Sequence, residues 1–215
     1  MVLAGPAEQV IMPGEIAPER LVLASGSTSR AGLLRAAGLR FAVDPAGIDE
    51  EAIKIRYRGI PAAAADCAAA LAEAKAQAVC QRHPGALVLG ADQILVAGER
   101  WYDKPADLAC ARDQLRRLRG RVHRLATAAC IVADGTCLWH ALSEPRLTMR
   151  AFSETFVESY LAAEGEAVLG SVGSYRLEAR GAQLFSRVEG DYFAILGLPL
   201  FELFDFLRRR GILAD

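Results

Sequence analysis

Residues 21–30 read LVLASGSTSR, an apolar run followed by a loop of small polar residues that ends in an arginine. The apolar run predicts a short buried strand over residues 21–24. A helix is predicted directly after the loop, through Leu33 and Leu34 to Gly38, because a residue without a β-carbon suits the end of a helix. A strand, a small polar loop and a helix in this order indicate an α/β fold.

The same alternation continues along the chain. Further helices are predicted over roughly residues 62–81, 108–118, 153–165 and 199–210. Further strands are predicted over residues 86–89, 94–97, 122–133 and 136–142, the last two joined by the turn Asp134-Gly135. Phe201, Phe204 and Phe206 on the last helix are expected in the core, with a dimer contact as the alternative. The pattern predicts one α/β domain over residues 1–215, with residues 1–20 as a poorly structured or loosely packed N-terminal extension.

Composition and charge exclude several classes of protein. Apolar residues make up 53% of the chain and charged residues 24%, which excludes a disordered protein and supplies a sizeable core. A net charge of −1 argues against general affinity for nucleic acids or acidic membranes, so neither is an expected partner. The five cysteines form no CxxC pair and are odd in number, which indicates neither a disulfide framework nor a zinc site. Without a signal-like or membrane-spanning apolar stretch, we expect a cytoplasmic protein.

The loop between the first strand and helix is a candidate anion site. Small residues let the backbone approach an anion, the free N–H groups at a helix start point toward it, and Ser25 and Ser27 add hydroxyl groups. Arg30 adds a bidentate phosphate donor. Ordinary helix capping explains the same loop without any ligand. The loop is not a Walker motif, because the GK[ST] ending is missing.

Lys75 lies on the wrong face of its predicted helix. At about 100° per residue, Lys75 falls at the centre of the apolar face. The other residues on that face are Ala64, Ala68, Leu71 and Val79, and those opposite are Asp66, Glu73 and Gln77. A lysine on a core-facing stripe needs a partner or a polar cavity, since burying an unpaired ammonium is costly. The alternative is that Lys75 reaches solvent at the helix edge.

Three acidic or basic positions complete the set of candidate residues. Asp92 is predicted at the carboxyl end of a buried strand, where open α/β sheets bind ligands, although a turn aspartate that bonds its own backbone gives the same pattern. The acidic run 49–51, which contains Glu50, is either a solvated loop or part of a metal site. Lys104, followed by a proline, contacts either a phosphate or only water.

The order of these motifs, from residue 21 to residue 199, resembles the Maf family of nucleotide pyrophosphatases. The family shows an ASxSPRR-like loop, a DE pair, a lysine in an alanine-rich helix, GAD and KP. The matching segments here are LASGSTSR, IDE ending at Glu50, LAEAKA with Lys75, LGADQ with Asp92 and DKP with Lys104. Downstream, GRVHRLAT resembles the family's GxxHxVxT segment, and GSYRLEARGAQLF with VEGDYFAILGLPL resembles its C-terminal signature.

The resemblance implies a fold, a reaction and a set of roles. The fold is an elongated, mixed and twisted sheet with flanking helices and a central cleft, similar to inosine-triphosphate pyrophosphatases, in chains that often pair as homodimers. A divalent cation, Mg²⁺ or Mn²⁺, is held near Glu50 and Asp92, and Asp92 is the general base for water attacking the α-phosphorus of a nucleoside triphosphate. The residues implied to bind the phosphates are Ser25, Ser27, Arg30, Lys75 and Lys104.

Departures from the family pattern bear on the substrate. Thr28 and Ser29 stand where the family has a proline and the first of two arginines, which lowers the expected phosphate affinity. Ser29, Gln93 and Glu178 are the implied base-specificity residues. Gln93 and Glu178 resemble the 7-methyl-GTP branch rather than the dTTP/UTP branch, although Ser29 lacks the bulk expected there. A carboxylate suits guanine, which presents N1–H and an amino group side by side, and repels the carbonyls of thymine and uracil.

Three other functions are compatible with the same residues. The first is a dTTP or UTP pyrophosphatase of the same family. The second is a catalytically weak nucleotide-binding regulator of cell division, against which the intact Glu50, Lys75, Asp92 and Lys104 argue. The third is a structural α/β domain that binds another phosphorylated metabolite, such as a sugar phosphate. The basic run around Arg116 is interpreted as a solvated helix end, because no aromatic residues are interleaved with it.

Overall fold

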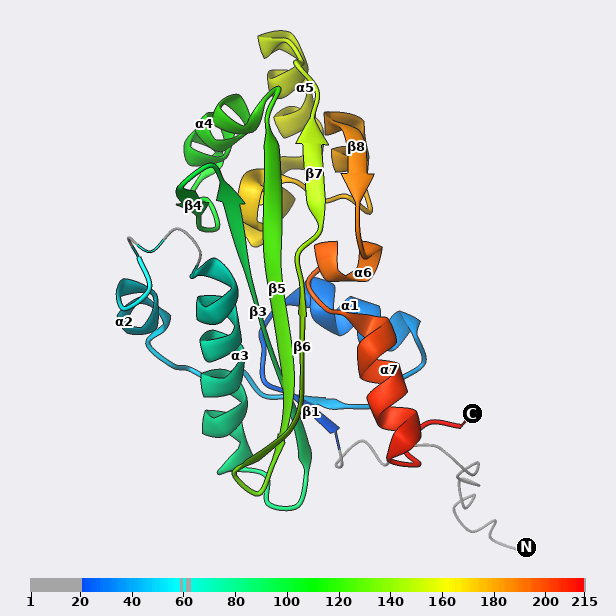
Figure 1. Ribbon diagram of the computed structural model, residues 1–215. Coiled ribbons are helices and arrows are strands. Elements are labelled where there is room, and N and C mark those ends of the chain that lie inside the picture. The colour runs from blue at the N-terminus through cyan, green and yellow to red at the C-terminus, as the bar shows by residue number, and fades with distance from the viewer. Residues whose placement is uncertain (1–20, 59, 61–62, 215) are drawn as a thin grey trace, which may run out of the picture.

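A single mixed sheet runs through the length of the molecule in the computed structural model, which describes residues 21–58, 60 and 63–214 (Figure 1). The expected N-terminal extension, residues 1–20, lies outside the described residues. The strands are β1 (Leu21–Leu23), β2 (Ala42–Val43), β3 (Leu87–Ala97), β4 (Arg100–Tyr102), β5 (Val122–Ala133), β6 (Thr136–Ser143), β7 (Arg146–Met149) and β8 (Phe185–Glu189). Their order is β2-β1-β3-β5-β7-β8, with β4 paired to β3 and β6 to β5.

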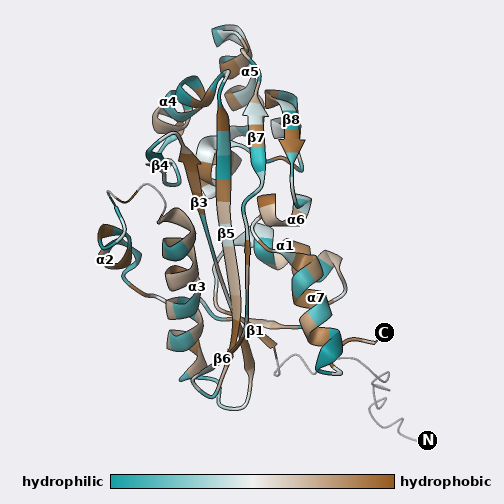
Figure 2. Ribbon diagram, viewed as in Figure 1, coloured by the Kyte–Doolittle hydropathy of each residue, from teal (hydrophilic) through white to brown (hydrophobic). Residues whose placement is uncertain are grey.

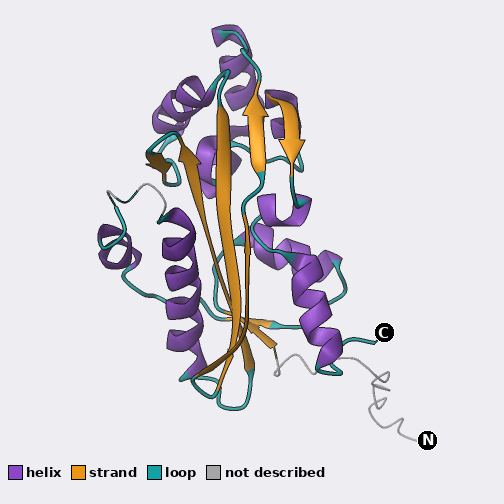
Figure 3. Cartoon of the chain, in the orientation of Figure 1, coloured by secondary structure: helices purple, strands orange, loops and turns teal. Residues whose placement is uncertain are grey.

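The sheet is parallel at one end only. β1 runs parallel to both β2 and β3, and every other pairing among the described strands is antiparallel. The long strands β3 and β5 pair from Val88 with Val132 to Val96 with Arg124 and form the spine of the elongated molecule (Figure 3). The elongated, mixed α/β sheet expected from the sequence is confirmed.

Helices cover both faces of this sheet. The α-helices are α1 (Thr28–Ala36), α2 (Glu50–Ile55), α3 (Ala64–Cys80), α4 (Leu108–Leu118), α5 (Glu154–Glu164), α6 (Tyr192–Ile195) and α7 (Leu200–Arg209). Short 3₁₀ turns lie at residues Gly165–Gly170, Val172–Ser174 and Arg180–Leu184. α3 packs on one face of the sheet, and α1 and α7 on the other. α4, α5 and the 3₁₀ turns enclose a third apolar cluster at the far end of the long strands. Figure 2 shows the hydropathy of each residue along the ribbon.

One strand prediction was wrong in a way that matters for the site. Residues 86–89 and 94–97 were expected to be separate, with Asp92 at a strand end, whereas β3 continues through Asp92. β5 provides the backbone partners, since Gly90 pairs with Cys130 and Asp92 with Ala128. The sheet still opens beside Asp92, because β1 ends at Leu23, opposite Leu89. Asp92 therefore faces a gap left by the shorter neighbouring strand.

The helix predictions agree better with the structure. Ser153 caps α5 by accepting a hydrogen bond from the Phe156 N–H at 3.2 Å, and α3 and α7 lie where expected except that residue 62 is outside the described residues. The core expectation for the last helix is confirmed for Phe206 and wrong for Phe201, which is 66% exposed. These two residues lie about 140° apart around the helix, so one apolar stripe cannot include both.

Two further observations concern the whole described chain. Among the described residues, no helix is both long enough and apolar enough to cross a bilayer. All five cysteine thiols are free, and Cys67, Cys80 and Cys130 are buried as small apolar side chains.

Gly90 allows α3 to pack directly against β3. A β-carbon at Gly90 would lie 2.0 Å from the Ala72 carbonyl oxygen and 2.9 Å from the Ala76 β-carbon. Any larger residue would therefore push the helix away from the strand. Because Lys75 lies on the same helical turn as these two alanines, the contact also sets the separation between Lys75 and β3.

We predict that Gly90→Ala lowers the free energy of unfolding by about 1–3 kcal/mol or more, because the clash is with backbone that cannot move aside cheaply. Gly32→Ala is the matched control, since no atom lies within 4 Å of the added carbon and its helix position favours alanine. Urea unfolding of the three proteins measures both effects. A Gly90→Ala protein as stable as the wild type would contradict the close packing.

Candidate active site

The serine-rich loop forms a polar turn at the start of α1. Ser27 caps this helix and accepts a hydrogen bond from the Arg30 N–H at 3.4 Å, and the Ser27 N–H donates to the Ser25 hydroxyl at 3.3 Å. Helix capping by Ser27, the alternative to anion binding, is therefore confirmed. It leaves the Ser27 and Ser29 hydroxyls beside the cavity that the loop borders. The same loop thus closes a helix start and presents polar groups to a ligand.

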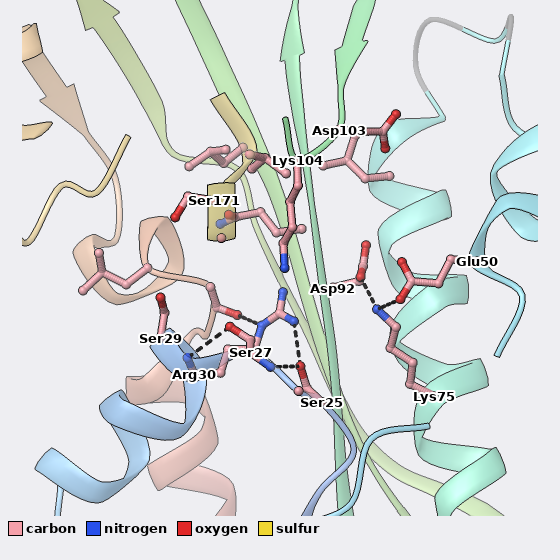
Figure 4. Close-up of a pocket in the computed structure, with 18 of the residues that line it drawn as sticks. Ser25, Ser27, Ser29, Arg30, Glu50, Lys75, Asp92, Asp103, Lys104 and Ser171 are labelled. Atoms are coloured by element: carbon pink, nitrogen blue, oxygen red, sulfur yellow. Dashed lines mark hydrogen bonds and ion pairs between the residues drawn. The ribbon is translucent and has the colours of Figure 1, made fainter. Parts of the chain in front are cut away.

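Arg30 is buried at the edge of the same cavity. Its Nε donates to the Gly197 carbonyl at 2.9 Å, and Nη1 donates to the Ser25 hydroxyl at 3.1 Å. These bonds fix the plane of the guanidinium between the loop and the C-terminal part of the chain (Figure 4). A guanidinium has five donor hydrogens, so the rest of the group remains able to bind an anion.

Lys75 lies between two carboxylates. Its Nζ is 2.5 Å from Asp92 Oδ1 and 2.8 Å from Glu50 Oε1, and the lysine is only 7% exposed (Figure 4). The apolar stripe of α3 points it inward as its spacing predicts, and the alternative that it reaches solvent at the helix edge is wrong. Two carboxylates compensate the buried ammonium, which is the partner that burial of a lysine requires.

α2 presents Glu50 to this pair and encloses one side of the cavity. Asp49 caps α2 by accepting from the Ala52 N–H at 3.0 Å, and Glu51 pairs with Arg58, so the acidic run has three separate roles. Burial opposes ionisation of Glu50, but the hydrogen bond and charge of Lys75 hold the pKa of Glu50 below its ordinary value. Glu50 is therefore ionised at neutral pH.

Lys104 approaches the cavity from the loop after β4. Burial, together with the positive charges of Arg30 and Lys75, lowers the pKa of Lys104. In Figure 4 its amine points toward the space between Arg30 and Asp92. Cations that repel one another in this way are relieved by a bound polyanion.

All the residues predicted from the sequence line one cavity of about 660 Å³. They are Ser25, Ser27, Ser29, Arg30, Glu50, Lys75, Asp92, Gln93, Lys104 and Glu178. A cavity of this volume is in the range of small-molecule sites. Most of the charged lining residues come from α1, α2, α3, β3 and the loop after β4. Gln93 bonds to the carbonyls of Ala194 and Ile195, and Glu178 follows Leu177 in the C-terminal segment.

Two of the three implied base-specificity residues, Gln93 and Glu178, differ in how much they are already bonded. Gln93 Nε2 lies 2.8 Å from the Thr127 hydroxyl, 2.9 Å from the Ala194 carbonyl and 3.1 Å from the Ile195 carbonyl. Glu178 is exposed and makes one long contact, 3.4 Å, from its Oε1 to Arg176 Nε. Glu178 is therefore the less constrained of the two.

The donor set suits a divalent cation that also takes ligands from a substrate. Glu50 and Asp92 converge on one ammonium, and the contacts to Lys75 use one oxygen of each carboxylate. The described residues contain no cluster of three acidic, histidine or cysteine side chains arranged for a metal. Mg²⁺ commonly takes only one or two carboxylates and completes its shell with phosphate oxygens and water. These two carboxylates fit that pattern.

Sequence reasoning missed Lys54 and Asp103. Lys54 Nζ is 2.6 Å from Asp103 Oδ1, and both residues line the cavity. Asp103 also contacts Arg58 at 3.3 Å, so α2 is tied to the loop that carries Lys104. A signal was present, because Lys54 is four positions after Glu50 and therefore on the same helix face. Nothing local indicates its partner 49 residues away.

Comparison with known proteins identifies the family to which this chain belongs. The family model described as Maf-like protein matches residues 20–210. The chain belongs to this family. A protein of Paramagnetospirillum magneticum named nucleoside triphosphate pyrophosphatase is 54% identical over 88% of this chain and 98% of its own length. One of Granulibacter bethesdensis with the same name is 48% identical over 90% and 98%. One of Rhizobium etli named 7-methyl-GTP pyrophosphatase is 45% identical over 89% and 96%.

We predict that Lys75→Met lowers the free energy of unfolding by about 3–5 kcal/mol, because it leaves two carboxylates facing each other without a cation. Lys54→Met is the matched control. Its partner Asp103 is half exposed and keeps Arg58, so a loss of at most about 1 kcal/mol is expected. Urea unfolding at pH 7 compares the two variants. Equal losses of unfolding free energy would show that burial does not increase the contribution of the Lys75 cluster to stability.

Proposed function

We infer that this Maf-like chain is a nucleoside triphosphate pyrophosphatase that converts a nucleoside triphosphate and water into a monophosphate and pyrophosphate. The observation that carries the inference is one cavity in which Arg30, Lys75 and Lys104 surround the buried Asp92. Three cations suit a triphosphate, and a carboxylate among them suits activation of water. The names of the relatives agree with this chemistry.

Asp92 is the proposed general base. Lys75 occupies Oδ1, which leaves Oδ2 to accept a proton from water. The water oxygen then bonds to the α-phosphorus, the bond from that phosphorus to the α,β-bridging oxygen breaks, and pyrophosphate leaves with the electron pair. Arg30, Lys104 and the Ser25–Ser27 turn would neutralise charge on the phosphates. Fixed donors around developing charge are the largest catalytic contribution in many enzymes.

A divalent cation, Mg²⁺ or Mn²⁺, is part of the proposal. Glu50 and Asp92 would hold it, and when bound it would supply further neutralisation of phosphate oxygens. Lys75, bonded to both carboxylates, keeps them oriented toward the cavity.

For the base we propose 7-methyl-GTP or a related modified nucleotide. Glu178 borders the cavity with an exposed carboxylate, which can accept hydrogen bonds from the adjacent N–H and amino groups of guanine. The name of the Rhizobium etli relative supports this choice. The dTTP/UTP alternative requires a base edge with carbonyls on both sides of its N–H to face the same carboxylate, which is unfavourable.

The remaining alternatives keep the cavity but change the outcome. A nucleotide-binding regulator of cell division would bind without turnover, and the intact Glu50, Lys75, Asp92 and Lys104 argue against it. A sugar-phosphate binder would bind phosphorylated sugars as tightly as nucleotides.

We predict that Asp92→Asn lowers pyrophosphate release by about 10²–10⁴-fold, which is the usual contribution of a general base, while nucleotide binding remains. Release is measured with Mg²⁺ and with Mn²⁺ across the normal nucleotides and 7-methyl-GTP, and binding by calorimetry. Asp66→Asn, on the exposed face of α3, is the control and keeps wild-type turnover. Unchanged turnover in Asp92→Asn would exclude Asp92 as the base. Binding without turnover in the wild type would favour the regulator.

We predict that Glu178→Gln reduces the preference for guanine bases by about 10- to 100-fold in kcat/KM, the value of a hydrogen bond to a charged group. Glu166→Gln, an exposed residue that does not line the cavity, is the control. The assay is the ratio of kcat/KM for 7-methyl-GTP to that for dTTP. A substrate ranking identical to that of the wild type would remove Glu178 from base recognition.

A further inference from the structure

Three carbonyl groups, two at the end of α6 and one in the turn before α7, are held by side chains from three separate elements. The Ala194 carbonyl accepts from the Thr127 hydroxyl at 2.9 Å and from Gln93 Nε2 at 2.9 Å, and Gln93 Nε2 also contacts the Ile195 carbonyl at 3.1 Å. The Gly197 carbonyl accepts from Arg30 Nε at 2.9 Å. Residues 195–197 line the cavity. The wall's position is therefore set from β3, β5 and α1.

The local sequence explains why this wall needs outside donors. α6 has only four residues and is capped by Asp191, which accepts from the N–H groups of Phe193 and Ala194. The carbonyls at the end of a helix have no partner within it. Gly197 then turns the chain with a φ of 112°, and the next helix begins at Leu200. The Ala194 carbonyl also accepts from the Gly197 N–H at 3.0 Å, whereas the Ile195 and Gly197 carbonyls accept from side chains that come from elsewhere.

Thr127 is the clearest member of this set because it has no contact with the cavity. It is 0% exposed in the middle of β5, and its hydroxyl accepts from Gln93 and donates to Ala194. Its role cannot be contact with a nucleotide. Gln93 borders the cavity, but its amide nitrogen carries two hydrogens and already faces three acceptors. This nitrogen has no hydrogen left for a base.

We propose that Thr127 and Gln93 are positioning residues that set base discrimination through the wall at residues 194–197, and that Gln93 does not donate to the base. The proposal rests on the proposed function, because it concerns which nucleotide that cavity accepts. A shift of this backbone moves Ile195 and Leu196 relative to Glu178, which lines the same cavity. Discrimination then depends on a hydroxyl that no substrate touches.

The test compares Thr127→Val, which removes the hydroxyl at nearly constant shape, with Thr127→Ser, which restores it. Thr148→Val in β7, outside the cavity lining, is the control. The first readout is the ratio of kcat/KM for 7-methyl-GTP to that for dTTP. We expect Thr127→Val to change this ratio on the order of fivefold, the effect of one buried hydrogen bond, mainly through KM. Thr127→Ser and Thr148→Val should keep the wild-type ratio.

The second readout needs no catalysis. Amide hydrogen exchange at residues 195–198 should be faster in Thr127→Val and in Gln93→Met than in the wild type, because these amides bond within the turn that the two side chains hold. If the wild type releases no pyrophosphate, the proposed function fails, and the ratio of the dissociation constants for the two nucleotides replaces the kinetic ratio.

Two results would overturn the proposal. One is a Thr127→Val protein with the wild-type ratio beside a Gln93→Met protein with a changed one, which would mean that Gln93 contacts the base itself. The other is unchanged exchange at residues 195–198 in both variants, which would show that the bonds do not hold the wall. A changed ratio together with faster exchange supports it.

Discussion

Burial of the Lys75 ammonium is the constraint on which the rest of the structure depends. A buried cation is tolerated only beside negative charge, and here the charge comes from α2 and β3, which are far apart in the sequence. Three elements must therefore meet at one point. Gly90 permits the meeting, since α3 could not approach β3 so closely over a side chain. The same requirement places two carboxylates at the cavity and keeps Glu50 ionised.

The charges on the other side of the cavity are arranged differently. Arg30 and Lys104 repel each other, and the pKa of Lys104 is lowered by burial and by these positive neighbours. The Lys75 cluster combines one positive charge with two negative ones, whereas the second pair consists of two positive charges. In the proposed function, a polyphosphate between the two groups would meet two cations at one end and the Lys75 cluster at the other. In the proposed function, that asymmetry would orient the substrate.

Local patterns predicted much of this arrangement and failed where partners are distant. The inward direction of Lys75 followed from helical periodicity, and the caps of α1 and α5 from residue type. The continuation of β3 through Asp92 could not be predicted from local patterns, because Asp92 pairs with Ala128 on another strand. Lys54 and Asp103 were missed for the same reason. The family resemblance brought the ten cavity residues together, but it could not show that Gln93 is bonded to carbonyls 101 and 102 residues away.

The two ends of the cavity are built on different physical principles. The end beside β3 and α3 uses charged side chains, whose interactions reach several ångströms and tolerate small displacements. The end beside α6 uses backbone carbonyls held by short, directional hydrogen bonds, which are sensitive to small displacements. Phosphate chemistry can therefore persist while the base-facing wall is altered by changes in buried residues such as Thr127. A family whose members carry both a general and a base-specific name is consistent with that separation. On the proposal made above, base preference is governed by how firmly a turn is held, and residues outside the cavity contribute to it.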